Sequence, residues 1–337
     1  MIIFTLICFV FLILFILPIF VALRVAKHIT KPLYINQHYI KDPRYFSNSF
    51  KKKLTNALKN HTSSNTIELS KKEPFINTRK NRLLANSLVE AVVYASEKNF
   101  IPKPNIIFKK EVYVKHNAIL KNIPEIRAIS CLENLTIGSG LVIKRWADAN
   151  GMVNINNNCN LGISTTSGTK LTIGKQCSFR RLYAPQIDIV PAYTQPNPAN
   201  HTASIVSNEL IYHIKYVNDL IVNSSGILNK SIISKHDIIV LDDYQVQGHI
   251  SCHKDIKLNS NVRIHGNLIA EGNIYISNNA VVNGVVFAQG SIYIDNNVVI
   301  GQPFKIKSVV ARNNITFGEN CRVYGYVSAE GKGYVSP

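Results

Sequence analysis

An 18-residue spacing of apolar residues is the feature that most constrains the fold of this 337-residue chain. Ile238, Ile256, Ile274 and Ile292 follow one another at this interval, and within each interval pairs of apolar residues recur every six residues. Alternation with a period of two buries one face of a short strand, and the step of six marks a corner between strands. Repeats of this length are typical of solenoids. The pattern predicts an all-β fold, a β-helix solenoid with about 18 residues and three strands per coil.

The template occurs in two arrays, which we place at residues 106–189 and 218–332. In the second array the interval lengthens to 23 residues after Ile292, because five extra residues follow Gly301 and bulge from one corner. Phe304 keeps the inward parity there, so we expect its side chain in the interior. The predicted core ladder consists of Ile238, Ile256, Ile274, Ile292 and Ile315.

The corners and the segment between the arrays carry their own signals. Asn261, Asn279 and Asn297 are 18 residues apart, and so are Gly248, Gly266 and Gly284. Tight corners need residues that tolerate positive φ, which Gly and Asn do, and stacked Asn side chains also form hydrogen bonds along the axis. Residues 190–217 lack the repeat and contain three prolines, which strands tolerate poorly. We predict that they form a projecting loop or a hinge.

The N-terminus predicts a membrane anchor. Residues 1–23 contain no charged side chain and are long enough to cross a bilayer core of about 30 Å. A secretory signal peptide is the alternative, but it needs a basic segment before the apolar one, and none is present. The positive-inside rule then places the rest of the chain in the cytoplasm. Residues 24–105 form a basic membrane-proximal region, in which the residues expected to face anionic lipid are Arg24, Lys27, Lys31, Lys51, Lys52 and Lys53.

Charge and cysteine content bound the possible partners. The net charge is +18, and residues 24–127 contain 21 basic and 7 acidic residues. Because this excess lies beside the predicted anchor, we attribute it to lipid and expect no nucleic acid partner. Five of the six cysteines occupy inward template positions, where they act as small apolar side chains, and none has the spacing of a zinc site. We expect free thiols, a reducing compartment and no cofactor.

The sequence from Val246 to Gly301 matches the pattern V-x-G-x-I-x-A-x-G-x-I-x-I-x-x-N-A-x-V and resembles the bactofilins, which are polymer-forming cytoskeletal proteins of bacteria. The resemblance is best over about residues 246–331 and partial over 129–189. It implies a right-handed, three-faced β-helix that polymerises end to end without nucleotide at the inner face of the cytoplasmic membrane. This chain departs from the family in its loops at 190–217 and 301–310, and it lacks the proline-rich tails that flank many family cores.

Self-association is also expected on physical grounds. The last rung of a β-helix presents unpaired backbone groups and an apolar cross-section, and the tail at residues 333–337 is too short to cover them. The end of the second array is therefore predicted to bind another copy of the chain. The residues expected at this assembly end are Phe317, Val323, Val327 and Ala329. Client proteins are not defined by the sequence.

Two other functions compete with a self-assembling scaffold. The step of six residues is also typical of hexapeptide-repeat acyltransferases, in which a His acts as general base, and His249, His253 and His265 are candidates. All three fall at outward parity, and the adjacent pair Asp242 and Asp243 points in opposite directions on a strand. A membrane-tethered adaptor that does not polymerise is the second alternative. We expect no catalytic, cofactor-binding or metal-binding residues, and favour a membrane-anchored scaffold.

Overall fold

A computed structural model describes residues 42–59, 65–190, 214–216, 220–221 and 226–337, together with Ile16 and Pro18. The chain divides into two compact units, residues 1–42 and 43–337, and the second contains the β-solenoid. No helix among the described residues is long and apolar enough to span a membrane. Apart from Ile16 and Pro18, the anchor predicted at residues 1–23 lies outside those residues, and so do Arg24, Lys27 and Lys31.

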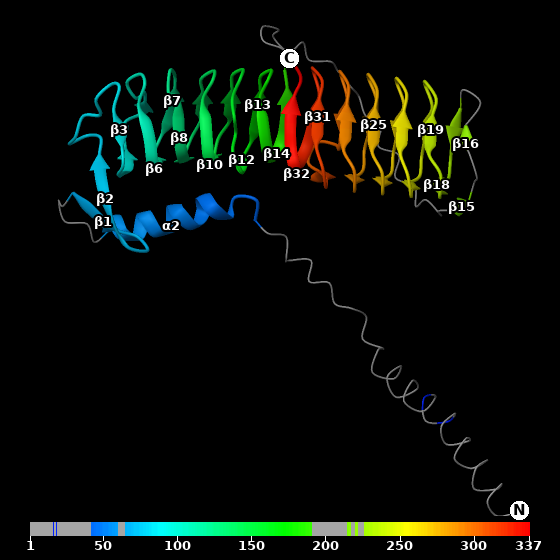
Figure 1. Ribbon diagram of the computed structural model, residues 1–337, viewed down its shortest axis with the longest axis horizontal. Coiled ribbons are helices and arrows are strands. Elements are labelled where there is room, and N and C mark those ends of the chain that lie inside the picture. The colour runs from blue at the N-terminus through cyan, green and yellow to red at the C-terminus, as the bar shows by residue number, and fades with distance from the viewer. Residues whose placement is uncertain are drawn as a thin grey trace, which may run out of the picture. The chain divides into compact units, whose positions relative to one another are not determined.

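Residues 43–337 form a β-solenoid of about 13 turns with about 18 residues each, which confirms the predicted fold (Figure 1). Each coil of the regular region contributes three short strands, and every strand pairs in parallel with the third strand after it, as β19 does with β22 and β20 with β23. The strands of the second array are β15 (Ile214–Tyr216), β16 (Leu220–Ile221), β17 (Ile227–Leu228), β18 (Ser231–Ser234), β19 (Ile238–Val240), β20 (Gln245–Val246), β21 (Ile250–Cys252), β22 (Ile256–Leu258), β23 (Arg263–Ile264), β24 (Leu268–Ala270), β25 (Ile274–Ile276), β26 (Val281–Val282), β27 (Val286–Ala288), β28 (Ile292–Ile294), β29 (Val299–Ile300), β30 (Lys307–Ala311), β31 (Ile315–Phe317) and β32 (Arg322–Val335).

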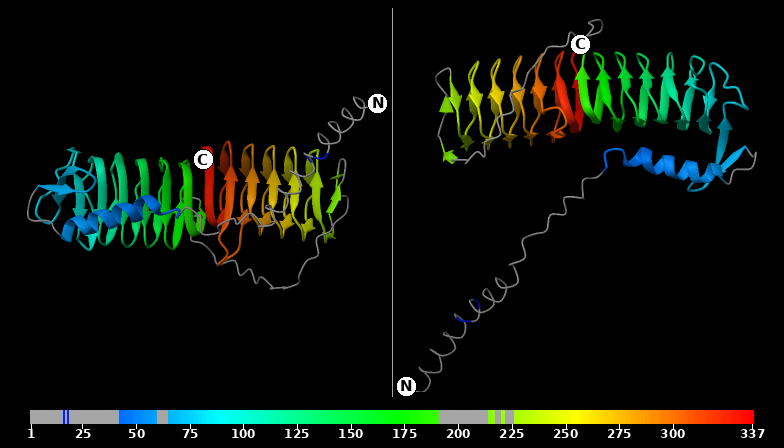
Figure 2. Two further views of the ribbon diagram at one scale, coloured as in Figure 1. Left: turned by 90° about the horizontal axis from the view of Figure 1, so that it is seen from below. Right: turned by 180° about the vertical axis from the view of Figure 1, so that it is seen from behind.

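The first array starts earlier than residue 106. Strands from residues 72–100 already pair in parallel with later coils, as β2 does with β4 and β5 with β7. A helix, α2 (Tyr45–Lys59), precedes them and packs along the array (Figure 2). The strands of this array are β1 (Thr66–Glu68), β2 (Lys72–Asn77), β3 (Leu88–Val89), β4 (Val92–Ala95), β5 (Asn99–Phe100), β6 (Ile107–Val114), β7 (Asn117–Leu120), β8 (Glu125–Cys131), β9 (Leu135–Ile137), β10 (Val142–Ala149), β11 (Val153–Ile155), β12 (Ser164–Ser167), β13 (Lys170–Ile173) and β14 (Ser178–Ile189).

The two arrays run toward each other along one axis. The first array ends at β14 near the middle of the rod, and the second begins at the far end with β15 and returns to the middle at β32 (Figure 1). There β14 and β32 pair antiparallel, whereas the other strand pairs formed by the described residues of the solenoid are parallel, apart from the β1–β2 hairpin. The rod of residues 43–337 is therefore two solenoids joined by their C-terminal ends.

The interior contains the rows that the period predicts. Ile238, Ile256, Ile274, Ile292 and Ile315 pair consecutively on the strands of one sheet, and each is 0% exposed. The row continues across the 23-residue interval because the extra residues leave the coil at a corner. Phe304 lies in this extra segment and is fully exposed, with a φ of 63°, so the prediction that it points inward is wrong.

The Asn corners and the Gly corners were both expected to have positive φ, but only the Asn corners do. Asn261, Asn279 and Asn297 have φ near 60°, and Asn279 and Asn297 each donate a side-chain hydrogen bond of 3.1 Å to the Asn one coil before. Gly266 and Gly284 do not have positive φ. Glycine is needed there because a Cβ on either residue would collide with the carbonyl oxygen of the glycine one coil before.

Candidate functional site

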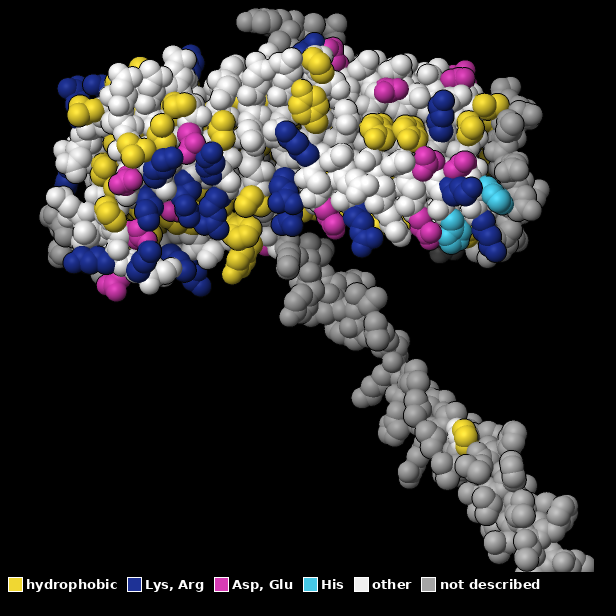
Figure 3. Space-filling model, viewed as in Figure 1, with side chains coloured by type: hydrophobic (Ala, Val, Ile, Leu, Met, Phe, Trp, Pro, Cys, Tyr) yellow, Lys and Arg dark blue, Asp and Glu magenta, His cyan; other side chains and the backbone are white. Residues whose placement is uncertain are grey.

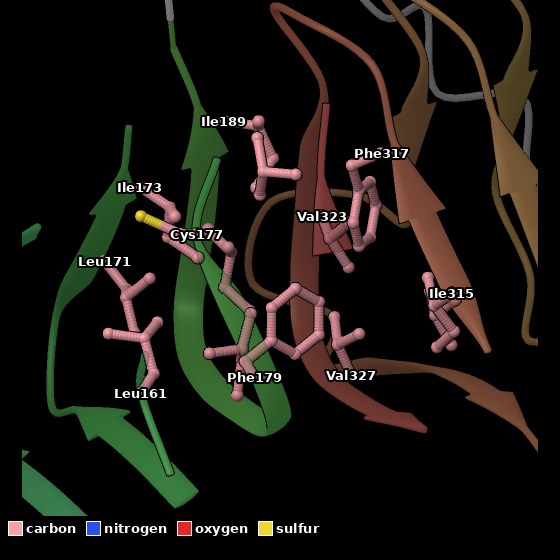
Figure 4. Close-up of a cluster of buried hydrophobic side chains, with 14 of the residues drawn as sticks. Leu161, Leu171, Ile173, Cys177, Phe179, Ile189, Ile315, Phe317, Val323 and Val327 are labelled. Carbon is pink, nitrogen blue, oxygen red and sulfur yellow. The ribbon is translucent and has the colours of Figure 1, made fainter. Parts of the chain in front are cut away.

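The joint between the arrays combines strand pairing with a shared apolar core. Leu182 lies opposite Val327 and Ile187 opposite Val323 in the β14–β32 register. The rings of Phe179 and Phe317 meet across the joint at 6.2 Å between centroids, and both are at most 2% exposed. Figure 4 shows Phe179 of the first array beside Phe317, Val323 and Val327 of the second in this shared core. Joining the two end rungs therefore removes both apolar cross-sections and both unpaired strand edges from water.

A buried carboxylate adds polar contacts to the joint. Asp188 of β14 accepts hydrogen bonds from Arg322 Nε of β32 and from Lys170 Nζ of the preceding coil, each at 2.7 Å. Burial by itself raises the pKa of Asp188, but the bonds from Arg322 and Lys170 outweigh it and hold the pKa below the ordinary carboxyl range. Lys175 and Glu319 form a further ion pair between the arrays. The contact is therefore specific in charge as well as in shape.

The predicted assembly end is occupied by this joint. Phe317, Val323, Val327 and Ala329 are at most 2% exposed, and β32 is paired with β14 along its outer side. The expectation that they form a free end for another copy of the chain is therefore wrong. The end rung is covered, as its apolar cross-section and strand edge require, but the cover is the first array of the same chain.

The two ends of the rod are both beginnings of arrays. At the far end β15, β16 and β17 each pair with one strand only among the described residues, namely β18, β19 and β20. At the other end the first coil is partly covered by the β1–β2 hairpin and by Leu83, which packs against the core. The rung formed by β15–β17 is therefore the less covered of the two among the described residues.

Helix α2 is held on the first array by one buried carboxylate. Asp148 points outward from β10, yet its side chain is only 1% exposed because α2 covers it. Arg44 donates to it through Nε at 2.6 Å and Nη2 at 2.9 Å, and Lys51 Nζ and Ser47 Oγ each donate at 2.7 Å. Thr166 Oγ1 on the next coil donates at 2.6 Å. Burial raises the pKa of Asp148, but Arg44, Lys51 and Thr166 together lower it below the usual range.

Apolar contacts complete the docking of α2 and decide which of its lysines are exposed. Leu54 is 0% exposed, and Phe50 packs against Trp146 with ring centroids 5.7 Å apart. Lys51 is bound to Asp148, so it does not point into solvent as predicted for a lipid-facing residue. Lys52 and Lys53 are exposed. The apolar face of the helix therefore packs on the sheet. Of its three consecutive lysines, Lys52 and Lys53 are available to a partner.

A regular column of basic residues escaped the sequence analysis. Lys109, Arg127, Arg145 and Arg181 are spaced by multiples of 18 residues, with Ile163 at the one remaining position. They lie at one corner of successive coils, where the register of β6 and of β10 shifts by bulges. The 18-residue period that predicts the core also predicts this column, because basic residues recur at it as apolar residues do. We call these four residues the basic column.

The histidines and acidic residues considered for catalysis form hydrogen bonds between coils. His249 Nδ1 accepts the backbone N–H of Asn267 at 2.8 Å, and His253 Nδ1 lies 2.9 Å from Glu271. His265 lies beside Gln245, and burial, with a smaller contribution from Arg263, lowers its pKa. The predicted acidic neighbours also bond along the axis, because Asp242 accepts the N–H of Ser260 at 2.9 Å and Asp243 accepts Asn261 Nδ2 at 2.8 Å.

The cysteines of the solenoid are buried free thiols. Burial raises the pKa of Cys131 to about 11 and that of Cys321 to about 12. Cys159 and Cys177 contact each other on adjacent coils. The hydrogen bond that the Cys177 thiol donates to Cys159 and burial both raise the pKa of Cys177, and the same bond lowers the pKa of Cys159. No group of three or more His, Cys, Asp or Glu in the described part of the chain is placed to hold a metal ion.

No protein-family model, no curated protein and no solved structure matches the chain. The resemblance to the bactofilins accordingly rests on the residues from Val246 to Gly301 and remains a prediction. Four features of the described residues can take part in binding or assembly: the joint, the rung at β15–β17, the helix α2 and the basic column.

Proposed function

We propose that this protein is a membrane-attached structural scaffold whose rod associates end to end without a nucleotide. The observation that carries the proposal is the joint, in which two end rungs of this template bind each other through antiparallel backbone pairing and complementary apolar residues. An end rung with one unpaired edge favours the same kind of contact with another molecule. The bactofilin resemblance supports this function, and with it a right-handed helix.

The joint changes which ends are proposed to associate. Because both C-terminal ends are covered within one chain, association between molecules uses the beginnings of the arrays, first of all the rung of β15–β17. Pairing of this rung with its own copy would be isologous and would stop at a dimer. A polymer requires that the other end of the rod also participates, so the size of the assembly reports which ends are used.

The membrane part of the proposal rests on residues 1–23, which contain no charged residue, and on the basic residues that follow. We propose a single-pass anchor in a bacterial inner membrane, with the solenoid on the cytoplasmic side. The membrane-tethered adaptor that does not polymerise is the alternative. It shares the anchor and differs only in leaving the end rungs unused.

Sedimentation of the full chain in detergent tests the proposal. Gly226 and Leu228 direct their carbonyl oxygens at β20, so Ile227 between them directs its backbone groups to the outer edge of the rung. Ile227→Pro removes the outward N–H without removing a bond to β20, and Ile227→Ala keeps that N–H. We expect wild type and Ile227→Ala to sediment as assemblies with or without nucleotide, and Ile227→Pro to shift toward monomer. A wild-type protein that is monomeric at every concentration would refute end-to-end association and would favour the membrane-tethered adaptor.

A further inference from the structure

We propose that the basic column and the exposed start of α2 together form a docking surface for an anionic lipid bilayer, so that the rod lies along the membrane instead of projecting from it. The inference rests on the membrane attachment in the proposed function and adds the orientation and the lipid class. Figure 3 shows Lys and Arg side chains gathered over the first array, with fewer over the second. Residues 65–190 contain 18 basic and 9 acidic residues, against 10 and 8 in residues 226–337.

The charges of the column are least compensated near the joint. Lys109 pairs with Glu125 at 2.9 Å and Arg127 with Glu111 at 3.1 Å. Arg145 and Arg181 are exposed and form no ion pair with any residue that the structure describes. Coils stack about 4.8 Å apart, so the column presents its cations in a straight row along the rod. A flat anionic surface complements such a row, because every member can approach it at once.

Exposed aromatic side chains lie near Arg145, in the half of the basic column that is closer to the joint. Tyr45 is 63% and Phe46 45% exposed at the first turn of α2, and their rings contact each other at 5.9 Å. Phe46 lies one helical turn before Phe50, which packs on Trp146, the residue that follows Arg145. Phe46 therefore points to the side of the helix that borders the column. Aromatic side chains next to basic ones are typical of the headgroup region of a bilayer.

The path of the chain favours lipid over nucleic acid as the partner. Residues 1–41 precede α2, so the polypeptide that carries the proposed anchor enters the solenoid at Arg44, where Asp148 fixes it. That point is Asp148 of β10, three residues after Arg145 along the strand and several coils from the beginning of the array. A tether attached at this place joins the rod beside the basic column and away from the two end rungs.

The single tryptophan gives a direct test, because Trp146 lies between the column and α2. The full chain is reconstituted into vesicles of phosphatidylcholine alone or with phosphatidylglycerol, each containing a phosphatidylcholine that carries a nitroxide on its headgroup. We expect stronger quenching of Trp146 emission in the anionic vesicles and loss of the difference in 1 M salt. Each arginine near an anionic membrane contributes about fivefold to the ratio of docked to undocked protein. In Arg145→Gln/Arg181→Gln this ratio should therefore fall by about 25-fold.

The matched control removes the same charge from the second array. Lys254 and Lys257 are exposed there, and Lys254→Gln/Lys257→Gln should quench as the wild type does. Thermal unfolding shows whether the variants are folded, and flotation of the vesicles shows whether the chain is attached at all. A chain that does not float refutes the anchor. A chain that floats but shows equal quenching in both lipids, or binding of duplex DNA that depends on Arg145 and Arg181 without lipid quenching, overturns the docking surface.

Discussion

Replacement of Asp148 by Asn should release helix α2 while the solenoid stays folded. The carboxylate accepts five hydrogen bonds from Arg44, Lys51, Ser47 and Thr166, and its side chain is 1% exposed. The amide keeps the shape but removes the charge, which leaves two cations without a counter-charge in a buried site. Breaking a buried ion pair costs about 3–5 kcal/mol. An isolated helix of this length is marginal in water, so this loss is enough to undock it.

The pH dependence of this contact follows from the lowered pKa of Asp148. A carboxyl group whose pKa is lower in the folded than in the unfolded state contributes stability above the unfolded-state pKa, and this contribution is lost as the pH falls through the folded-state pKa. The helix should therefore remain docked through neutral and mildly acidic pH. It should be released only in strong acid, below the ordinary pKa range of a carboxyl group.

The emission of Trp146 reports the release, because its ring contacts Phe50 of α2. In Asp148→Asn we expect a red shift of this emission and fast hydrogen exchange over residues 45–59, with β-sheet circular dichroism unchanged. Lys51→Met should give a weaker form of the same result. Lys52→Met, which changes the next residue on the exposed side of the helix, should give none. Unchanged emission and exchange in Asp148→Asn would refute the argument that this carboxylate holds the helix.

Three further predictions concern the interior. Phe317→Ala should lower the free energy of unfolding by about 3–5 kcal/mol, since the ring is 0% exposed at the joint, whereas Phe304→Ala at a fully exposed position should change it little in chemical denaturation. Ile274→Asp places a charge in the core ladder at a cost of several kcal/mol and should unfold the protein, while Tyr275→Asp on the outer face should lose only the stacking on its neighbour and should fold, as circular dichroism will show. The thiols of Cys131 and Cys321 should not react with a thiol reagent at pH 8 until denaturant is added, because burial raises their pKa values to about 11 and about 12 and keeps them protonated; rapid reaction of either thiol in the native solenoid would contradict its burial.

The fold was predictable where the repeat is exact and not where it varies. From Ile238 to Ile294 the interval is constant, so parity alone assigns the interior of each coil. The coils before residue 106 were missed because their corners are irregular, with 19 residues from Asn86 to Asn105 and 17 from there to Asn122. Phe304 was placed inside because parity does not reveal a residue that leaves the coil altogether.

The candidate site was less predictable, since it depends on relations between distant segments. A period has no direction, so it does not reveal that the second array runs back toward the first and covers its end. Asp148 occupies an ordinary outward position, and its partner Arg44 lies 104 residues away on a helix whose docking face no local pattern specifies. The basic column, in contrast, was accessible, because Lys109, Arg127 and Arg145 keep the same 18-residue interval as the core.

Cross-linking between the two arrays tests the central claim, that one chain joins two solenoids by their C-terminal ends. Arg181 and Ser328 lie directly opposite each other in the β14–β32 register, at a separation that a disulfide can bridge. We expect Arg181→Cys/Ser328→Cys to form the bond within one chain on mild oxidation, so that the unreduced protein migrates faster as a monomer in denaturing electrophoresis. Arg181→Cys/Val310→Cys, which moves the second cysteine one coil away, should not cross-link. A bond that forms only between two chains, or none in either variant, would contradict the joint.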